Sequence, residues 1–201
     1  MTRRIVVATR NRGKLREIVP LLAGLDLELR TIDELAPDAE LREDGVTFEE
    51  NALAKARQAA RATGLPAIAD DSGLEVDALG GAPGVYSARY AGLPSDDVRN
   101  NAKLTAALAA LPAGPHAGRF RCVAAFVDPR RGCELVRSGS CEGQILPVPR
   151  GAGGFGYDPL FLLPTLGRTM AELSVEEKNR LSHRAAAFAG LAAALREDLS
   201  R

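Results

Sequence analysis

Residues 69–77 of the chain read Ala69-Asp70-Asp71-Ser72-Gly73-Leu74-Glu75-Val76-Asp77 and place a cluster of carboxylates directly after a short apolar run. The apolar run, residues 66–69, predicts a brief buried strand. Residues 70–73 predict the turn that ends this strand, because Gly73 has a backbone freedom that larger residues lack. Two adjacent carboxylates at a strand end can share a divalent cation, or one can act as a base. An Asp-Ser-Gly turn whose side chains bond only their own backbone is the alternative.

The overall composition is that of a soluble globular protein. The chain has 201 residues, of which 46% are hydrophobic, and its 26 basic and 26 acidic side chains give a net charge of zero. This length suits one large domain or two closely joined lobes. The balanced charge argues against a broadly basic nucleic-acid surface, so a polyanion would have to bind a local cluster of Lys and Arg.

The cysteines and the hydropathy pattern indicate a cellular location. Cys122, Cys133 and Cys141 are odd in number and lack the close spacing of metal sites, which favours reduced thiols in a cytosol. We see no apolar signal segment before the first predicted strand and no run long enough to cross a bilayer. The expectation is a cytoplasmic protein without a membrane partner.

An anion-binding layout is predicted near the N-terminus. Residues 4–8 predict a central strand, and a helix is expected to run through Leu22. The connecting loop offers backbone N–H groups and a helix N-terminus, and it carries three full positive charges, so phosphate is its natural ligand. It lacks the Walker A spacing, and such strand-to-helix turns are also common without a ligand. The loop consists of Thr9, Arg10, Asn11, Arg12, Gly13 and Lys14.

A second helix should begin at the capping-box pattern Thr47-Phe48-Glu49-Glu50 and run to about Gly64. Glu50 fits a cap better than a ligand contact. Lys55, inside the helix, is either part of a solvated face or a contact for phosphate. Glu43, shortly before the helix, is either an ordinary loop acid or a metal carboxylate.

The middle of the chain predicts a helix and then a hairpin. Ser95 is expected to cap a structural helix that ends before Pro112, with one face formed by Val98, Ala102, Thr105 and Leu108. Residues 119–127 and 133–139 predict two strands joined by a short turn, which makes an antiparallel hairpin. The sheet is therefore predicted to be mixed rather than purely parallel and doubly wound.

A glycine-rich stretch, residues 151–161, reads Gly151-Ala152-Gly153-Gly154-Phe155-Gly156-Tyr157-Asp158-Pro159-Leu160-Phe161. It holds three of the nine aromatic side chains of the chain. Glycines between aromatic rings let a flat ligand approach the backbone, so a stacked base is the candidate ligand. The alternative is a turn whose aromatic rings fill the core.

Two further helix starts follow this stretch. Ser174-Val175-Glu176-Glu177 repeats the capping pattern and starts a short helix that carries Lys178. Ser182-His183-Arg184 opens a last helix through Leu199, where the helix N-terminus could bind an anion or a carbonyl. A His-Arg pair that simply faces solvent is the other interpretation.

Taken together, these motifs resemble the inosine/xanthosine triphosphate pyrophosphatase family. The resemblance covers nearly the whole chain and rests on five stretches: residues 9–14, 70–74, 80–84, 153–159 and 182–184. It implies an α/β fold of two lobes around an elongated mixed sheet with flanking helices. It also implies a single domain over residues 1–201, with the active-site cleft between its lobes, and a homodimer.

The resemblance further implies Mg²⁺-dependent hydrolysis of ITP, dITP and XTP to the monophosphate and pyrophosphate, which cleanses the nucleotide pool. By position, Asp71 is expected to be the general base and a magnesium ligand, and Glu43 a further metal carboxylate. We expect a nucleotide as the ligand and no nucleic acid. The expected substrate contacts are Thr9, Arg10, Asn11, Arg12, Gly13, Lys14, Lys55, Ser72, Phe155, Gly156, Tyr157, Asp158, Lys178, His183 and Arg184.

The physical chemistry of the substrate agrees with this set. A triphosphate requires cations where charge builds up and an oriented water. Hypoxanthine and xanthine present an acceptor at position 6 where adenine presents a donor, so N–H donors near His183 and Arg184 would disfavour adenine. Three rivals stay open: a pyrophosphatase for pyrimidine or modified nucleotides, a nucleotide sensor without turnover, and a phosphatase with an aspartate nucleophile.

Overall fold

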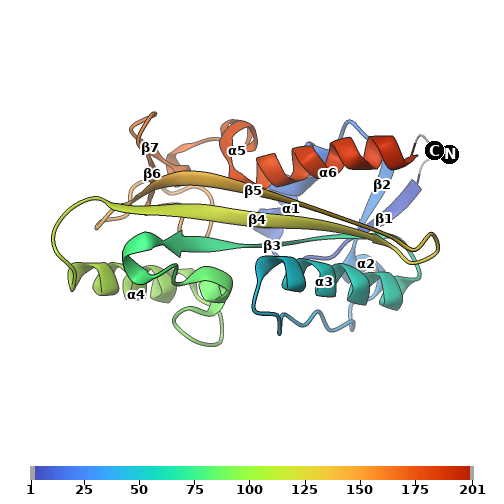
Figure 1. Ribbon diagram of the computed structural model, residues 1–201, viewed down its shortest axis with the longest axis horizontal. Helices are drawn as coiled ribbons and strands as arrows, with labels where there is room; N and C mark the ends of the chain where they lie inside the picture. The colour runs from blue at the N-terminus through green and yellow to red at the C-terminus, as the bar shows by residue number, and fades with distance from the viewer. Residues whose placement is uncertain (1–2, 200–201) are drawn as a thin grey trace. The chain divides into compact units, whose positions relative to one another are not determined.

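The computed structural model describes residues 3–199, which form a mixed seven-stranded sheet with flanking helices (Figure 1). The strand order is β2-β1-β3-β4-β5-β6-β7. The strands are β1 (Arg3–Val7), β2 (Leu27–Thr31), β3 (Ala67–Val76), β4 (His116–Asp128), β5 (Cys133–Ile145), β6 (Phe161–Leu163) and β7 (Arg168–Thr169). The α-helices are α1 (Arg12–Leu22), α2 (Ile32–Leu35), α3 (Phe48–Thr63), α4 (Asp97–Ala109), α5 (Val175–Leu181) and α6 (His183–Leu199). Three 3₁₀ helices are η1 (Asp77–Leu79), η2 (Gly84–Arg89) and η3 (Met170–Glu172).

Strand pairing confirms the prediction of a mixed sheet. β1 pairs in parallel with β2 and with β3, so that Ile5 lies beside Leu29 and Val6 beside Ala67. β6 is antiparallel to both β5 and β7. The predicted hairpin is β4 and β5, which are neighbours in the sheet and are joined by the turn at residues 129–132.

The chain divides into two compact units, each with its own core. Unit 1 comprises residues 1–71, 122–139 and 183–201, and unit 2 comprises residues 72–121 and 140–182. The core of unit 1 gathers Ile68 of β3, Phe126 of β4 and Phe188 of α6. The core of unit 2 gathers Leu104 of α4 and Leu160.

The turn predicted at residues 70–73 was wrong, because strand β3 continues through these residues without a break. Asp70 and Asp71 are buried at 1% and 6% exposure, where cationic side chains compensate their charges. Buried carboxylates that are paired do not need the solvent that a turn would offer. The strand ends only after Val76.

The predicted helix starts were largely correct. Thr47 and Glu50 form the capping box of α3, and Gly64 ends this helix with φ 67°. Ser174 caps α5 in the same way. The cap of α4 is Asp96, which accepts from the N–H of Arg99, and the predicted cap Ser95 instead donates to the carbonyl of Ala88.

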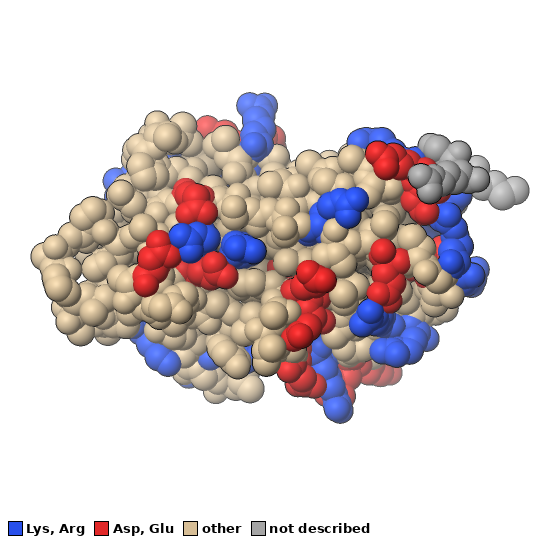
Figure 2. All heavy atoms as spheres, viewed as in Figure 1, with Lys and Arg blue, Asp and Glu red and all other residues tan. Residues whose placement is uncertain are grey.

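Charges of both signs are interspersed on the face drawn in Figure 2, as expected for equal numbers of acidic and basic residues. Among the described helices, none combines the length and the apolarity that crossing a membrane requires.

Candidate functional site

Asp71 of unit 1 is held by two donors from one helix. Its Oδ1 accepts a hydrogen bond from Nζ of Lys55 at 3.1 Å, and its Oδ2 accepts from Nδ2 of Asn51 at 3.1 Å. Asn51 and Lys55 lie one turn apart on α3, so both face the same strand. Burial raises the pKa of Asp71, and the nearby Lys55 and Lys14 offset only part of that rise. A buried carboxylate with a raised pKa and a fixed orientation suits a general base.

Lys55 is a buried cation between two acids. Its side chain is 7% exposed, so the solvated face considered for it is wrong. Its Nζ forms ion pairs with Asp71 and with Glu43. Burial lowers the pKa of Lys55, but the carboxylates of Asp71, Glu43 and Asp70 together outweigh burial and leave that pKa raised. The ammonium group therefore stays charged and brings Glu43 and Asp71 to a common point.

The same two carboxylates fit a magnesium ion. Mg²⁺ prefers oxygen ligands and is usually bound by one or two carboxylates, with waters and substrate phosphates in the other positions. Glu43 and Asp71 already share one cation, the ammonium of Lys55, so this place in the unit favours positive charge. Within residues 3–199, no group of three or more His, Cys, Asp or Glu could hold a metal. The protein would thus supply two carboxylates and leave the remaining positions to water and phosphate.

Asp70, the neighbour of Asp71, belongs to a separate buried ion network. Its Oδ2 lies 3.1 Å from Nζ of Lys14 and 3.2 Å from Nη2 of Arg184. Arg184 is 1% exposed and also donates to Glu17. Burial raises the pKa of Asp70, but Lys14 and Arg184 outweigh burial and hold that pKa well below its usual range. Asp70 is therefore ionised at neutral pH and paired with two cations.

The residues predicted to grip phosphate have several local tasks. Helix α1 begins at Arg12 and is capped by Asn11, whose Oδ1 accepts from the N–H of Lys14 at 3.1 Å. Thr9 is buried, and its Oγ1 accepts from the N–H of Asn11. Arg10 instead holds the segment after β2: it donates to Asp33 at 2.7 Å and to the carbonyls of residues 37 and 39. Arg12 is exposed and Gly13 half-buried at the start of the helix.

His183 is the first residue of α6 and is 6% exposed. Arg184 follows it and is fully buried, so the solvent-facing alternative for this pair is wrong. Through the adjacent Asp70 and Asp71, the ion pairs described above bring together five predicted site residues of unit 1: Asp71, Glu43, Lys55, Lys14 and Arg184.

In unit 2, the glycine-rich loop presents one aromatic ring. Phe155 is half-buried, and Nζ of Lys178 lies 5.3 Å from the centroid of its ring. Asp158 anchors both residues, because its Oδ2 accepts from the N–H of Phe155 at 2.9 Å and from Nζ of Lys178 at 2.7 Å. Ser72, the first residue of this unit, is half-buried on β3.

Tyr157 and Gly156 differ from Phe155 in their surroundings. The ring of Tyr157 is part of the unit 2 core, and its hydroxyl donates to the carbonyl of Ser87 at 2.9 Å. The alternative in which aromatic rings fill the core thus describes Tyr157 and Phe161, which is fully buried, but not Phe155. Gly156 is held through its backbone by two side chains of α4.

Sequence reasoning missed several residues of these clusters. Asn51 was not among the predicted site residues, although its place four residues before Lys55 on one helix is a usable signal. Glu17 stands three residues after Lys14 on α1 and binds Arg184. No local signal marks Asp97 and Asn101, because the loop that they hold lies more than fifty residues further along the chain.

Comparisons with known proteins agree over nearly the full length. A model of the Ham1 family matches residues 5–194. The dITP/XTP pyrophosphatase of Geobacter sulfurreducens is 55% identical over 186 residues, which cover 92% of this chain and 93% of that protein. The protein of the same name from Xanthomonas campestris pv. campestris is 53% identical, with 93% and 94% covered. The solved structure of a HAM1 protein from Coxiella burnetii superposes with a TM-score of 0.88 at 43% identity and covers 97% of this chain and 99% of that one. The Staphylococcus aureus Ham1 protein gives 0.86 at 42% identity, with 98% and 100% covered.

Proposed function

The chain belongs to the Ham1 family, and from this premise we propose that it is a magnesium-dependent enzyme in which Asp71 is the general base. It hydrolyses non-standard purine nucleoside triphosphates, of the dITP, ITP and XTP type, to the monophosphate and pyrophosphate. The observation that carries the proposed mechanism is the clamp on Asp71, whose two oxygens are held by Asn51 and Lys55 beside Glu43.

Asp71 supplies the proton acceptor that the reaction needs. A water oxygen forms a bond to the α-phosphorus, the bond from that phosphorus to the bridging oxygen breaks, and pyrophosphate leaves. Asp71 takes the proton that the attacking water loses, and the Asn51 amide keeps the carboxylate in one orientation. When bound by Asp71 and Glu43, Mg²⁺ would neutralise phosphate charge and acidify a coordinated water.

The cations of unit 1 serve the phosphates. Lys14 and Lys55 are charged, partly or fully buried and next to the two aspartates, so they can neutralise charge that develops on the triphosphate. The N-terminus of α1 adds backbone N–H groups in the loop from Thr9 to Lys14. We assign Arg184 to the support of Asp70, because its guanidinium is already bound between Asp70 and Glu17.

The glycine-rich loop of unit 2 serves the base. The half-buried ring of Phe155 offers a stacking surface, and Lys178 adds a positive charge close to that ring. Tyr157 and Asp158 support the loop from the core and from Lys178.

Product analysis tests this proposal. The wild type should release pyrophosphate from dITP and XTP with Mg²⁺, and EDTA should abolish the release. Asp71→Asn should lower turnover by about 10²–10⁴-fold while nucleotide binding persists, since a general base contributes about that much. Near-normal turnover in that variant would refute the role of Asp71. Release of inorganic phosphate alone would favour the phosphatase rival, and equal rates with pyrimidine nucleotides would favour the other pyrophosphatase.

We also propose a cytoplasmic homodimer that binds neither nucleic acid nor membranes. The zero net charge supports the absence of nucleic-acid binding, and the three free cysteines support a cytoplasmic location. The homodimer rests on the family resemblance alone. Sedimentation equilibrium should give twice the chain mass of 21.2 kDa, and a monomer at micromolar concentration would contradict it.

A further inference from the structure

The peptide groups of Gly156 are held from both sides by helix α4. The N–H of Gly156 donates to Oδ2 of Asp97 at 2.7 Å, and its carbonyl accepts from Nδ2 of Asn101 at 2.9 Å. Asp97 and Asn101 are four residues apart, so they lie on one face of α4 one turn apart. Two side chains of one helix thus fix a single residue of the loop.

The same face of α4 anchors the helix to the loop's own core. Leu104 and Leu108 continue the stripe that Asp97 and Asn101 begin, and both are buried in the cluster that contains Tyr157. The apolar half of this face packs in the core, and the polar half reaches Gly156. The position of α4 therefore fixes the position of Gly156, the residue that follows Phe155.

The loop between residues 154 and 158 is closed by two hydrogen bonds between Phe155 and Asp158. The N–H of Phe155 donates to the side-chain Oδ2 of Asp158, and the carbonyl of Phe155 accepts from the N–H of Asp158 at 3.2 Å. Gly154 and Gly156 flank the ring with φ of 71° and 60°, the left-handed region that glycine tolerates. The N–H of Phe155 thus donates to Asp158 and the N–H of Gly156 donates to Asp97, so neither is available to a ligand. Phe155 is therefore left to contact a ligand through its ring and not through these N–H groups.

Asn101 uses the donor side of its amide in this contact. Its Oδ1 is buried and has no hydrogen-bond partner among residues 3–199. The bond from its Nδ2 to Gly156 gives the reason for an amide at this place.

We propose that Asp97 and Asn101 are positioning residues for base recognition, which hold the peptide of Gly156 and so fix the ring of Phe155 against the purine. This inference rests on the proposed function, in which Phe155 stacks on the base. It predicts that the two residues affect binding of the purine and not the chemistry at the phosphates.

Product inhibition separates the two effects, because IMP carries the base and pyrophosphate does not. Asn101→Asp keeps the size of the side chain but removes the donor. It should raise the inhibition constant of IMP and the KM for dITP by about tenfold, the effect of one lost hydrogen bond. The inhibition constant of pyrophosphate and kcat should stay within about threefold of the wild type.

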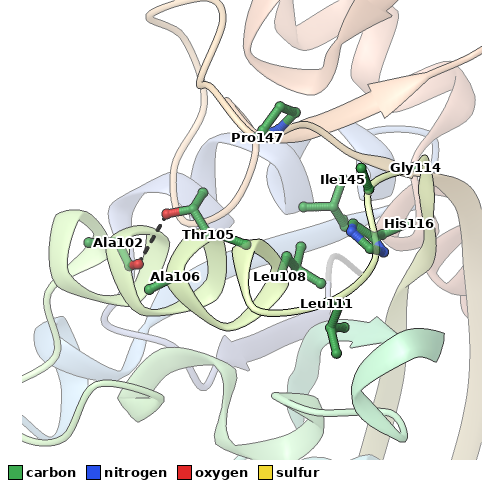
Figure 3. A pocket seen from close by; sticks show the side chains of 11 residues that line it. Ala102, Thr105, Ala106, Leu108, Leu111, Gly114, His116, Ile145 and Pro147 are labelled. Atoms are coloured by element: carbon green, nitrogen blue, oxygen red, sulfur yellow. Dashed lines mark hydrogen bonds between the residues drawn. The ribbon is translucent and has the colours of Figure 1, made fainter.

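Two further variants complete the design. Asp97→Asn keeps an acceptor for the N–H of Gly156 and should resemble the wild type, whereas Asp97→Ala should behave like Asn101→Asp. Thr105→Val is the control on the same helix. Thr105 lines a hollow of 570 Å³ together with Ile145 and Pro147 (Figure 3). Its hydroxyl donates to the carbonyl of Ala102, as Figure 3 shows, and also to that of Asn101. This variant should leave all four constants unchanged.

Each outcome decides a separate question. If the wild type releases no pyrophosphate from dITP or XTP, the proposed function fails. If the wild type is active but Asn101→Asp and Asp97→Ala keep the wild-type constant for IMP, only the positioning inference fails. An equal loss for IMP and pyrophosphate would also overturn it. Thermal unfolding shows whether each variant folds, and where Asn101→Asp does not, the two Asp97 variants give the same test.

Discussion

Asn51 reaches Oδ2 of Asp71 from helix α3 at 3.1 Å, and it is itself fully buried. Its Oδ1 accepts from the N–H of Gly45 at 2.8 Å, so one amide ties the loop before α3 to the carboxylate on β3. Glu43 stands in that loop. Asn51 therefore holds the Asp71 carboxylate directly and, through Gly45, the loop that carries Glu43.

Replacement of Asn51 by Ala should lower kcat/KM by about 10–100-fold and raise the Mg²⁺ concentration needed for half-maximal rate, as losses of supporting groups around metal ligands do. Steady-state kinetics over a magnesium series measures both effects. Gln58→Ala is the matched control, because Gln58 ties the same loop to α3 at Arg42 without contacting Asp71. Equal losses in the two variants would show that only the loop anchor matters.

Asp70→Asn should destabilise the fold by about 3 kcal/mol at pH 7, because it leaves the buried Arg184 with Glu17 alone. The pKa of Asp70 in the folded state lies below its ordinary value of 3.8, so its stabilisation is present above that pH and is lost as the pH falls. The difference between wild type and variant should therefore shrink below about pH 4. Urea unfolding at pH 7 and pH 3 checks this, and a difference that does not change with pH would contradict it.

Lys55→Met should lower kcat/KM by about 10²–10³-fold, the usual cost of losing one donor to the charge that develops in the transition state. The variant also leaves Asp71 and Glu43 without the cation that they share. Lys55→Arg keeps the charge and should recover part of the loss. Steady-state rates with dITP test the pair, and full activity in Lys55→Met would remove Lys55 from the mechanism.

Cys122 should resist alkylation in the folded protein. Burial, followed by the charge of Asp70, raises the pKa of its thiol to about 12, so at pH 8 only about one thiol in 10⁴ is ionised. Iodoacetamide at pH 8 should label the half-buried Cys133 well before Cys122, and urea should expose all three thiols. Mass spectrometry gives the order, and early labelling of Cys122 would show that this core opens readily.

Local signals explain which parts of the fold could be predicted. The capping boxes at Thr47 and Ser174 gave the starts of α3 and α5, because a cap depends on four neighbouring residues. The turn at residues 70–73 was wrong because the burial of Asp70 depends on Lys14 and Arg184, which lie far away in the sequence. No local pattern contains such a partner.

The candidate site was likewise predicted in part. Asp71, Lys55 and Glu43 were all named from the sequence, and the structure brings them together. The predicted apolar face of helix α4 was partly correct, because Leu108 is buried but Ala102 is exposed. Val98 is 78% exposed, whereas Leu104 is fully buried, because an alanine-rich helix offers two apolar stripes of similar strength.

The place of Asn51 and Lys55 on one face of α3 limits the insertions and deletions that the first turn of this helix can accept. Each residue inserted or deleted between the cap Thr47 and Asn51 would rotate the rest of α3 by about 100° and carry both donors off the carboxylate together. Length variation among natural variants should therefore fall in the segment before Glu43, whereas a frame-preserving indel in the first turn of this helix would inactivate the enzyme in a single step.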